Sequence, residues 1–240
     1  MKPLNTVDDI KSLGTILGVW AHPDDETFSM GGIMAAAVGN GQKVSCVTAT
    51  RGEAGVQDES RWPAARLGEI RTAELRASME ILGVTDHCWL DYPDGKCNVV
   101  PTEDGVGRIA DCINRCQPDT ILTFGPDGMT GHPDHQTVSD WAKRAMEYTG
   151  SQANLYYAVQ THAQYDAMIE ADKQFNIFFN IDKPPTCESG QCSVCFELDD
   201  NLYLCKIAAL KAMPSQTESI MQFFEDSLRT SLGTEAFVKA

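Results

Sequence analysis

The chain has 240 residues, of which 42% are hydrophobic and 22% are charged, so its composition is that of a globular protein and excludes a disordered or fibrous one. Lys and Arg number 19 against 34 Asp and Glu, which gives a formal net charge of −15. A charge of this sign repels nucleic-acid phosphates and anionic lipid, so neither is expected as a partner.

The first predicted element is a buried strand over residues 15–22, because the run is short, apolar and rich in β-branched residues and stops at Pro23. The clearest helix spans residues 66–84, where apolar residues recur at helical spacing and Gly83 supplies a stop. The other elements predicted in this half are a helix over 26–38 and strands over 43–50 and 87–92.

The second half is predicted to continue the alternation and then to change. A helix over 106–117, a strand over 120–125 and a helix over 132–150 are followed by two further strands, over 154–160 and 175–181. The last forty residues are predicted to form two helices broken at Pro214. Residues 182–195 have the composition of a linker and are interpreted as a surface excursion of a single domain spanning 1–240.

This order of elements predicts the fold class. Strands that alternate with helices at these spacings form βαβ units, and therefore an α/β protein with a mostly parallel sheet covered by helices on both faces. In such sheets a ligand binds beyond the carboxyl ends of the strands. The two most polar loops follow the strands at 15–22 and 120–125, so both are expected at that edge.

Three of the five histidines lie in these two loops, within the sequences AHPDDE (21–26) and GHPDH (131–135). A catalytic zinc site uses three histidine or carboxylate ligands and leaves one position for water. His22 and Asp25 are three residues apart on a turn entering a helix, and His135 is the best distant ligand. We therefore predict a metal site formed by these three residues. Ferrous iron accepts the same donor set, so the choice of metal stays open.

The remaining polar residues of the two loops suit acid–base chemistry. Asp24 is adjacent to the ligands and is predicted to take a proton from water. His132 is a candidate for polarising a carbonyl or protonating a leaving group, and Asp134 for holding a histidine in one tautomer. The alternative is that these acids only cap helices. Capping does not explain why the histidines accompany them.

These motifs resemble those of the LmbE-like, or PIG-L, superfamily of zinc-dependent N-deacetylases. Further similar segments follow in the same order, namely TRGEAG (50–55), IRTAEL (70–75), ILGV (81–84) and DYPDG (91–95). The resemblance covers residues 15–150, and beyond them only KIAAL (206–210) and SQ (215–216). Many members carry a histidine shortly before that SQ, where this chain has Met213 nearby, so no role is carried over for it.

The resemblance implies a Rossmann-like sheet whose pocket is completed by C-terminal strands and helices. It also implies zinc held by His22, Asp25 and His135, with Asp24 as general base and His132, partnered by Asp134, as the group that stabilises the oxyanion or protonates the amine. It further implies that Arg71 and Asp94 bind sugar hydroxyls. The alternatives for these last two are a solvated helix face beside Glu69 and Glu74 for Arg71, and a turn-forming role for Asp94.

The function expected from these features is hydrolysis of the N-acetyl, or a related acyl, group of a small-molecule amino sugar or its conjugate. An amidase acting on a larger thiol–sugar conjugate would use the same centre. A metal-binding module without catalysis is the alternative outside enzymes, but Asp24 and His132 would then be spare acid–base groups. Dinucleotide binding is disfavoured, because acidic residues and no glycine-rich loop follow the first strand.

Cysteine usage and the N-terminal residues bear on location. The first residues carry acids and no apolar core of a signal sequence, and no segment has the roughly 18 apolar residues of a membrane span, so a cytoplasmic protein is expected. The nine cysteines are then expected to be reduced thiols. A thiolate metal site formed by Cys187, Cys192, Cys195 and Cys205 is the alternative. A homo-oligomer is compatible with the sequence, and His87 is expected in the core or at a sheet edge. The loop of His162 is a second, weaker candidate for the pocket.

Overall fold

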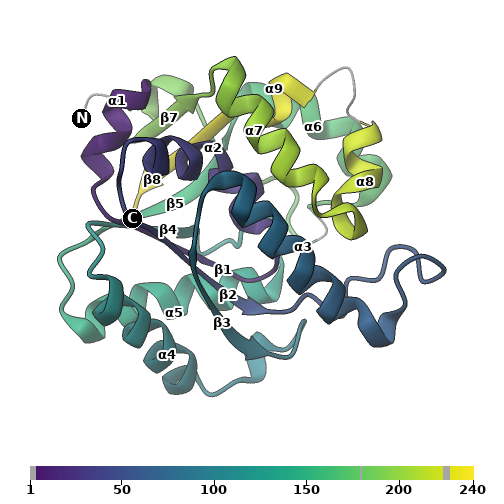
Figure 1. Cartoon of the computed structure of the whole chain (residues 1–240), viewed down its shortest axis with the longest axis horizontal. Coiled ribbons are helices and arrows are strands. Elements are labelled where there is room, and N and C mark those ends of the chain that lie inside the picture. Colours follow the sequence, from purple (N-terminus) through teal and green to yellow (C-terminus); the bar gives the residue numbers. More distant parts are fainter. Residues whose placement is uncertain (1–3, 179, 224–227) are drawn as a thin grey trace.

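One mixed sheet runs through the computed structural model, which describes residues 4–178, 180–223 and 228–240 (Figure 1). Its eight strands have the order β3–β2–β1–β4–β5–β8–β7, with β6 paired to β5. The strands are β1 (Ile16–Trp20), β2 (Val44–Thr50), β3 (Asp86–Tyr92), β4 (Thr120–Phe124), β5 (Asn154–Thr161), β6 (Thr186–Cys187), β7 (Val194–Glu197) and β8 (Thr234–Lys239).

Helices cover both faces of this sheet, as predicted for an α/β protein. Figure 1 shows α4 and α5 on one face and α2, α3 and α7 on the other. The helices are α1 (Val7–Ile10), α2 (Asp25–Gly39), α3 (Leu67–Leu82), α4 (Thr102–Cys116), α5 (Pro133–Thr149), α6 (His162–Phe175), α7 (Asp200–Lys211), α8 (Pro214–Phe223) and α9 (Leu228–Leu232). In the described part of the chain, none of them combines the length and the apolar character that crossing a membrane requires.

The strands from β3 to β5 pair in parallel, and this part of the sheet confirms the predicted βαβ order. Every residue of β1, β2 and β4 is buried, because central parallel strands have helices on both faces. The layer of α4 and α5 packs closely at Gly105, where a Cβ atom would lie 2.3 Å from the indole ring of Trp141. Parallel pairing aligns the carboxyl ends of β1 to β4 along one edge, and this edge carries the site.

The C-terminal third differs from the prediction in three places. The strand expected at 175–181 is wrong for its described residues, because α6 ends at Phe175 and a turn follows; residue 179 lies outside the described part. Phe178 packs against Tyr165 instead, and the described residues of this segment form no strand pairing. The helices flanking Pro214 are confirmed, but the antiparallel strand β8 and the helix α6 were not predicted.

The segment interpreted as a surface excursion contributes to the sheet. β6 and β7 fall in or next to residues 182–195, and β7 pairs with β8. Cys187 and Cys192 form a disulfide, so the expectation of reduced thiols is wrong for this pair, and with it the four-thiolate metal site. Cys195 is a buried free thiol and Cys205 lies on α7, where its Sγ is 3.6 Å from the Ile81 carbonyl oxygen. The two bonded cysteines are five positions apart in the sequence, and their Cα atoms are 6.3 Å apart, within the usual disulfide range.

Candidate active site

Two strand-to-helix turns build the centre of the site. The first turn follows β1, and its Asp24 adopts φ 112° before α2 begins at Asp25. The second follows β4 and ends at His132, which precedes Pro133 in the first position of α5. A proline with no N–H fits that position, where the amide has no helical partner. Because β1 and β4 are paired neighbours, the two turns face each other at the same sheet edge.

Three side chains from these turns place their donor atoms close together. His22 Nδ1 lies 3.1 Å from His135 Nε2, while Asp25 Oδ2 lies 3.6 Å from the first nitrogen and Asp25 Oδ1 lies 3.5 Å from the second. Ligand atoms about 2.0–2.2 Å from a tetrahedral zinc ion are separated by about 3.3–3.6 Å. The donor triangle of His22, Asp25 and His135 therefore has the chemistry to hold a divalent cation, and its distances of 3.1–3.6 Å are close to those of a zinc site.

The outer nitrogen of each histidine is fixed by a partner. His135 Nδ1 is 2.9 Å from the Gly128 carbonyl oxygen, and His22 Nε2 is 3.0 Å from Asp94 and 3.3 Å from Asp134. A proton donated to these acceptors leaves a lone pair on His135 Nε2 and His22 Nδ1, the two atoms that face each other. Such outer partners orient metal-binding histidines and raise their basicity.

The electrostatics of these side chains agree with this arrangement. Burial lowers the pKa of His135 to about 4, so its ring is neutral. Burial also opposes charge on His22, but hydrogen bonds to Asp134, Asp25 and Asp94 raise its pKa well above the ordinary value. Burial would raise the pKa of Asp25, yet His135 and His22 hold it below its usual range. His22 thus carries a positive charge beside the Asp25 carboxylate. A bound cation would take over that charge and displace the proton from His22.

Asp94 and Asp134 both meet His22. Asp94 also accepts a hydrogen bond from the Ala54 amide at 2.9 Å, and His22 is the main influence that brings its pKa down to about 2 against the effect of burial. Asp134 is fully buried and accepts from the Gly95 and Cys97 amides at 2.7 and 2.9 Å. The Asp134 carboxylate contacts His22, whereas the expected partner of Asp134 is His132, whose Nδ1 accepts a hydrogen bond from the Asp134 amide. The contacts of Asp94 are those of a residue that orients His22, and its predicted sugar contact stays a prediction.

His132 lies at the edge of the triangle. Ring nitrogens of His22, His132 and His135 all lie within 4.8 Å of one another. His132 Nδ1 accepts a hydrogen bond from the Asp134 amide at 3.1 Å, so the neutral ring carries its proton on Nε2. Burial and the charge on His22 lower its pKa, which favours this neutral form. His132 can therefore donate a hydrogen bond to a ligand in the centre.

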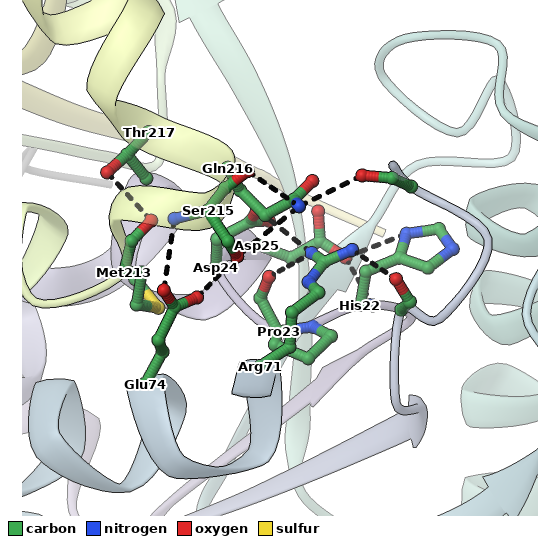
Figure 2. Close-up of polar contacts among 12 residues, drawn as sticks. His22, Pro23, Asp24, Asp25, Arg71, Glu74, Met213, Ser215, Gln216 and Thr217 are labelled. Atoms are coloured by element: carbon green, nitrogen blue, oxygen red, sulfur yellow. Dashed lines mark hydrogen bonds and ion pairs between the residues drawn. The ribbon is translucent and has the colours of Figure 1, made fainter. Parts of the chain in front are cut away.

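Arg71 contacts the residue predicted to be the general base. Figure 2 shows its side chain pointing from α3 towards Pro23 and Asp24. Nη2 donates to the Pro23 carbonyl at 2.6 Å and to Asp24 Oδ2 at 3.1 Å, and Nη1 donates to the Gly52 carbonyl at 2.8 Å. Only 4% of Arg71 is exposed, so the alternative of a solvated helix face is wrong. Its contacts position Asp24, and its sugar contact stays a prediction.

The close approach of Arg71 depends on a glycine. Gly52 has φ +67°, and a Cβ atom there would lie 2.2 Å from Arg71 Nη1. Burial raises the pKa of Asp24 to about 7, while the guanidinium of Arg71 acts in the opposite direction. Burial is the larger of these two opposing effects on the pKa of Asp24.

Two further polar groups lie in this region, and the sequence assigned neither of them a specific contact. Glu26 is fully buried, and its Oε1 accepts from the Asp24 amide at 3.3 Å; burial raises its pKa to about 8. Ser215 at the start of α8 bonds Glu74 on α3 through its amide at 3.0 Å and its hydroxyl at 2.5 Å (Figure 2). Its neighbour Gln216 donates to the Gly55 carbonyl at 3.0 Å. The SQ segment is the signal that pointed to these contacts.

The other two histidines lie elsewhere. His87 contacts Thr48 and packs edge-on against Trp89, so the prediction that it belongs to the core or to a sheet edge is confirmed. His162 begins α6 and lies 3.0 Å from Glu188, with 47% of its side chain exposed. His162 thus contacts Glu188 at the surface.

Comparison with known proteins places this geometry in context. The family model described as PIG-L, GlcNAc-PI de-N-acetylase, matches residues 17–146. A "1D-myo-inositol 2-acetamido-2-deoxy-alpha-D-glucopyranoside deacetylase" from Kineococcus radiotolerans is 34% identical over 55% of this chain and 44% of its own. One of the same name from Corynebacterium glutamicum is 30% identical over 84% of this chain and 74% of its own. The chain thus spans about half the length of the first of these relatives.

Solved structures share the fold at lower identity. The N,N'-diacetylchitobiose deacetylase from Pyrococcus horikoshii superposes with a TM-score of 0.69 at 22% identity, covering 96% of this chain and 85% of its own. A 4-carboxy-2-hydroxymuconate hydratase from Pseudomonas putida gives 0.61 at 18% identity, covering 95% and 96%. The same fold therefore carries different reactions, and the chemistry has to be argued from the site.

Proposed function

The chain belongs to the PIG-L family of GlcNAc-PI de-N-acetylases, and from this premise we propose that it is a zinc-dependent hydrolase of the N-acyl group of an amino sugar. The observation that carries the proposal is the donor triangle of His22, Asp25 and His135 with the carboxylate of Asp24 beside it. An acid–base residue next to the metal ligands is expected in a catalytic metal site and is not required in a metal protein without catalysis.

The reaction is the addition of water to an amide. His22, Asp25 and His135 would hold the zinc ion, which when bound would supply a Lewis acid for the carbonyl and lower the pKa of the attacking water. Asp24 takes the proton that water loses as its oxygen bonds to the carbonyl carbon. The C–N bond then breaks, the nitrogen receives a proton, and the products are a free amine and a carboxylic acid.

His132 acts on the other side of the carbonyl carbon. Its Nε2–H donates to the oxygen that gains negative charge, because Nδ1 is already occupied by the Asp134 amide. A donor that is in place before the reaction stabilises the transition state more than the substrate. Arg71 supports the reaction indirectly, since its guanidinium donates to Asp24 and to the carbonyl groups of Pro23 and Gly52.

The substrate class follows from the relatives. Those reported above are named for a GlcNAc–inositol compound, and a structural neighbour is named for diacetylchitobiose, so an N-acetylated glucosamine derivative is the first choice. The test is to load purified protein with zinc and incubate it with N-acetylglucosamine, diacetylchitobiose and the GlcNAc–inositol compound, measuring free amine. Asp24→Asn is the control. If zinc-loaded protein releases no amine from any N-acylated amino sugar, the proposal is wrong.

A further inference from the structure

An apolar cavity of about 160 Å³ adjoins the donor triangle. Asp25 and His135 form part of its wall, and the ring of Phe124 stacks on His135 with centroids 4.0 Å apart. Most of the remaining wall is hydrophobic, with Phe28, Ala158, Met168, Phe178 and Leu232 among its residues. A group in this cavity is therefore within reach of the reacting centre.

The cavity lies on one side of the centre only. Its wall comes mainly from β4, β5 and β8 and from the helices α6, α8 and α9, and the first turns of α2 and α5 close it towards the centre. The polar groups Asp94 and Arg71 approach the centre from β3 and α3, on the side of β2 and β3. Sheet order thus separates an apolar side of the centre from a polar side.

Several polar groups in the cavity wall are occupied by the protein. The Glu235 carboxylate accepts from the Gly32 and Ile33 amides, both at 2.7 Å, and from Lys206 Nζ at 2.8 Å. The Gln164 amide donates to the Ser231 and Thr234 carbonyls. Among the described residues, only Gln160 Oε1 and Ser231 Oγ of the wall are buried without a partner. The wall therefore offers much hydrophobic contact and few hydrogen bonds, which does not suit a sugar.

An amide is planar, and in its trans form the two substituents point in opposite directions. With the carbonyl at the donor triangle, the sugar on nitrogen extends to the polar side and the acyl group extends into the cavity. An acetyl methyl group fills little of such a space, whereas an apolar cavity of about 150 Å³ holds a benzene-sized molecule. Resting on the proposed hydrolase function, we propose that this cavity is an acyl subsite for an unbranched chain of about four to six carbons.

The experiment is a chain-length series. N-acetyl-, N-butanoyl-, N-hexanoyl- and N-decanoylglucosamine are compared by kcat/KM with zinc-loaded protein. We expect a gain of up to about fourfold for each buried methylene as far as hexanoyl, and a fall for decanoyl. A parallel series of N-acetylglucosamine glycosides with alkyl aglycones is expected to show no such rise. If acetyl is cleaved best, or if only the aglycone series rises, the acyl subsite is wrong while the hydrolase function stands. If no compound is cleaved, the hydrolase function itself fails.

Substitutions in the cavity wall test whether the acyl chain binds in this cavity. Ala158→Leu narrows the cavity and is expected to lower the hexanoyl-to-acetyl ratio of kcat/KM at least about tenfold. Met168→Ala widens it and should move the optimum to octanoyl. Ala163→Leu is the matched control, because Ala163 is exposed on α6 and is not part of the wall. Equal ratios in the two leucine variants would overturn the location.

Binding provides a readout that does not need turnover. Hexanoate, the expected acid product, should bind the wild-type protein more tightly than acetate in calorimetric titrations. Ala158→Leu should remove this difference and Ala163→Leu should retain it. Equal affinity of the wild-type protein for the two acids would count against the subsite, whatever the rates.

Discussion

Lys206 Nζ lies 2.8 Å from Glu235 Oε1, and both side chains are fully buried. The pair sits where α2 is interrupted at Met30, whose φ is −141°. Glu235 accepts the amides of Gly32 and Ile33 after the interruption, and Lys206 donates to the Phe28 carbonyl before it. The pair thus satisfies backbone groups that the interrupted helix leaves open, directly behind the turn that carries Asp24 and Asp25.

Removing one member of this pair is expected to be costly. Lys206→Met leaves the Glu235 carboxylate buried without its cation, so the free energy of unfolding should fall by about 3–5 kcal/mol. Urea denaturation measures the loss. The control is Lys173→Met, which removes an exposed ion pair with Glu170 and should cost less than about 1 kcal/mol. Similar losses in the two variants would contradict the structural role of the pair.

The donor triangle predicts which residues retain metal. His22→Ala, Asp25→Ala and His135→Ala should each lose bound metal and activity together, because three ligands remain necessary for tight zinc binding. Elemental analysis of the purified variants gives the metal-to-protein ratio. His162→Ala, at the surface beside Glu188, should keep the wild-type ratio. Full metal content in all three ligand variants would rule out the assignment.

Asp24→Asn separates chemistry from metal binding. The amide keeps the size of the side chain but takes no proton, so turnover should fall by about 10²- to 10⁴-fold while metal content stays near normal. His132→Ala should lower turnover as well, because the residue donates to the substrate and its loss leaves the triangle complete. Near-normal turnover of Asp24→Asn at neutral pH would move the role of base to Glu26, whose Oε1 accepts a hydrogen bond from the Asp24 amide.

Substitution of Arg71 distinguishes between two roles for this residue, namely positioning of Asp24 and binding of the sugar. Arg71→Ala leaves Asp24 and two buried carbonyl groups without their donor, so kcat/KM should fall for an N-acetylated sugar and for a simple N-acetyl amine alike. A residue that binds sugar hydroxyls would affect only the sugar. Asp94→Ala is expected to follow the same pattern and also to weaken metal binding through His22. A loss confined to the sugar would restore the substrate-binding role.

The buried His87, which lies outside the active site, is expected to make the stability of the protein depend on pH. Burial, with a smaller effect of Arg51, lowers its pKa from 6.5 to about 4. The unfolded chain therefore binds more protons than the folded one between these values, and stability falls as the pH drops from 6.5 towards 4. The loss from this group approaches about 3 kcal/mol. Denaturation curves of His87→Gln should lack that part of the decline; identical pH profiles would contradict it.

The sequence by itself was enough to predict the parallel half of the sheet and the residues that meet at its edge. Apolar runs followed by AHPDDE and GHPDH indicate two strand ends, and parallel pairing brings such ends together. His22 and His135, which are 113 positions apart, could therefore be assigned to one centre without knowledge of side-chain geometry. Local periodicity and the alignment of neighbouring strands contain this information.

Only the tertiary structure decided what surrounds that centre. Asp94 meets His22, and Arg71 is buried against Asp24, because the loops after β2 and β3 fold over the turn after β1. The apolar cavity is closed by α6, α9 and β8. The sequence did not predict the helix α6 or the strand β8. Their short runs of residues are compatible with several local conformations. The choice among them depends on packing between residues far apart in the chain, which no local pattern records.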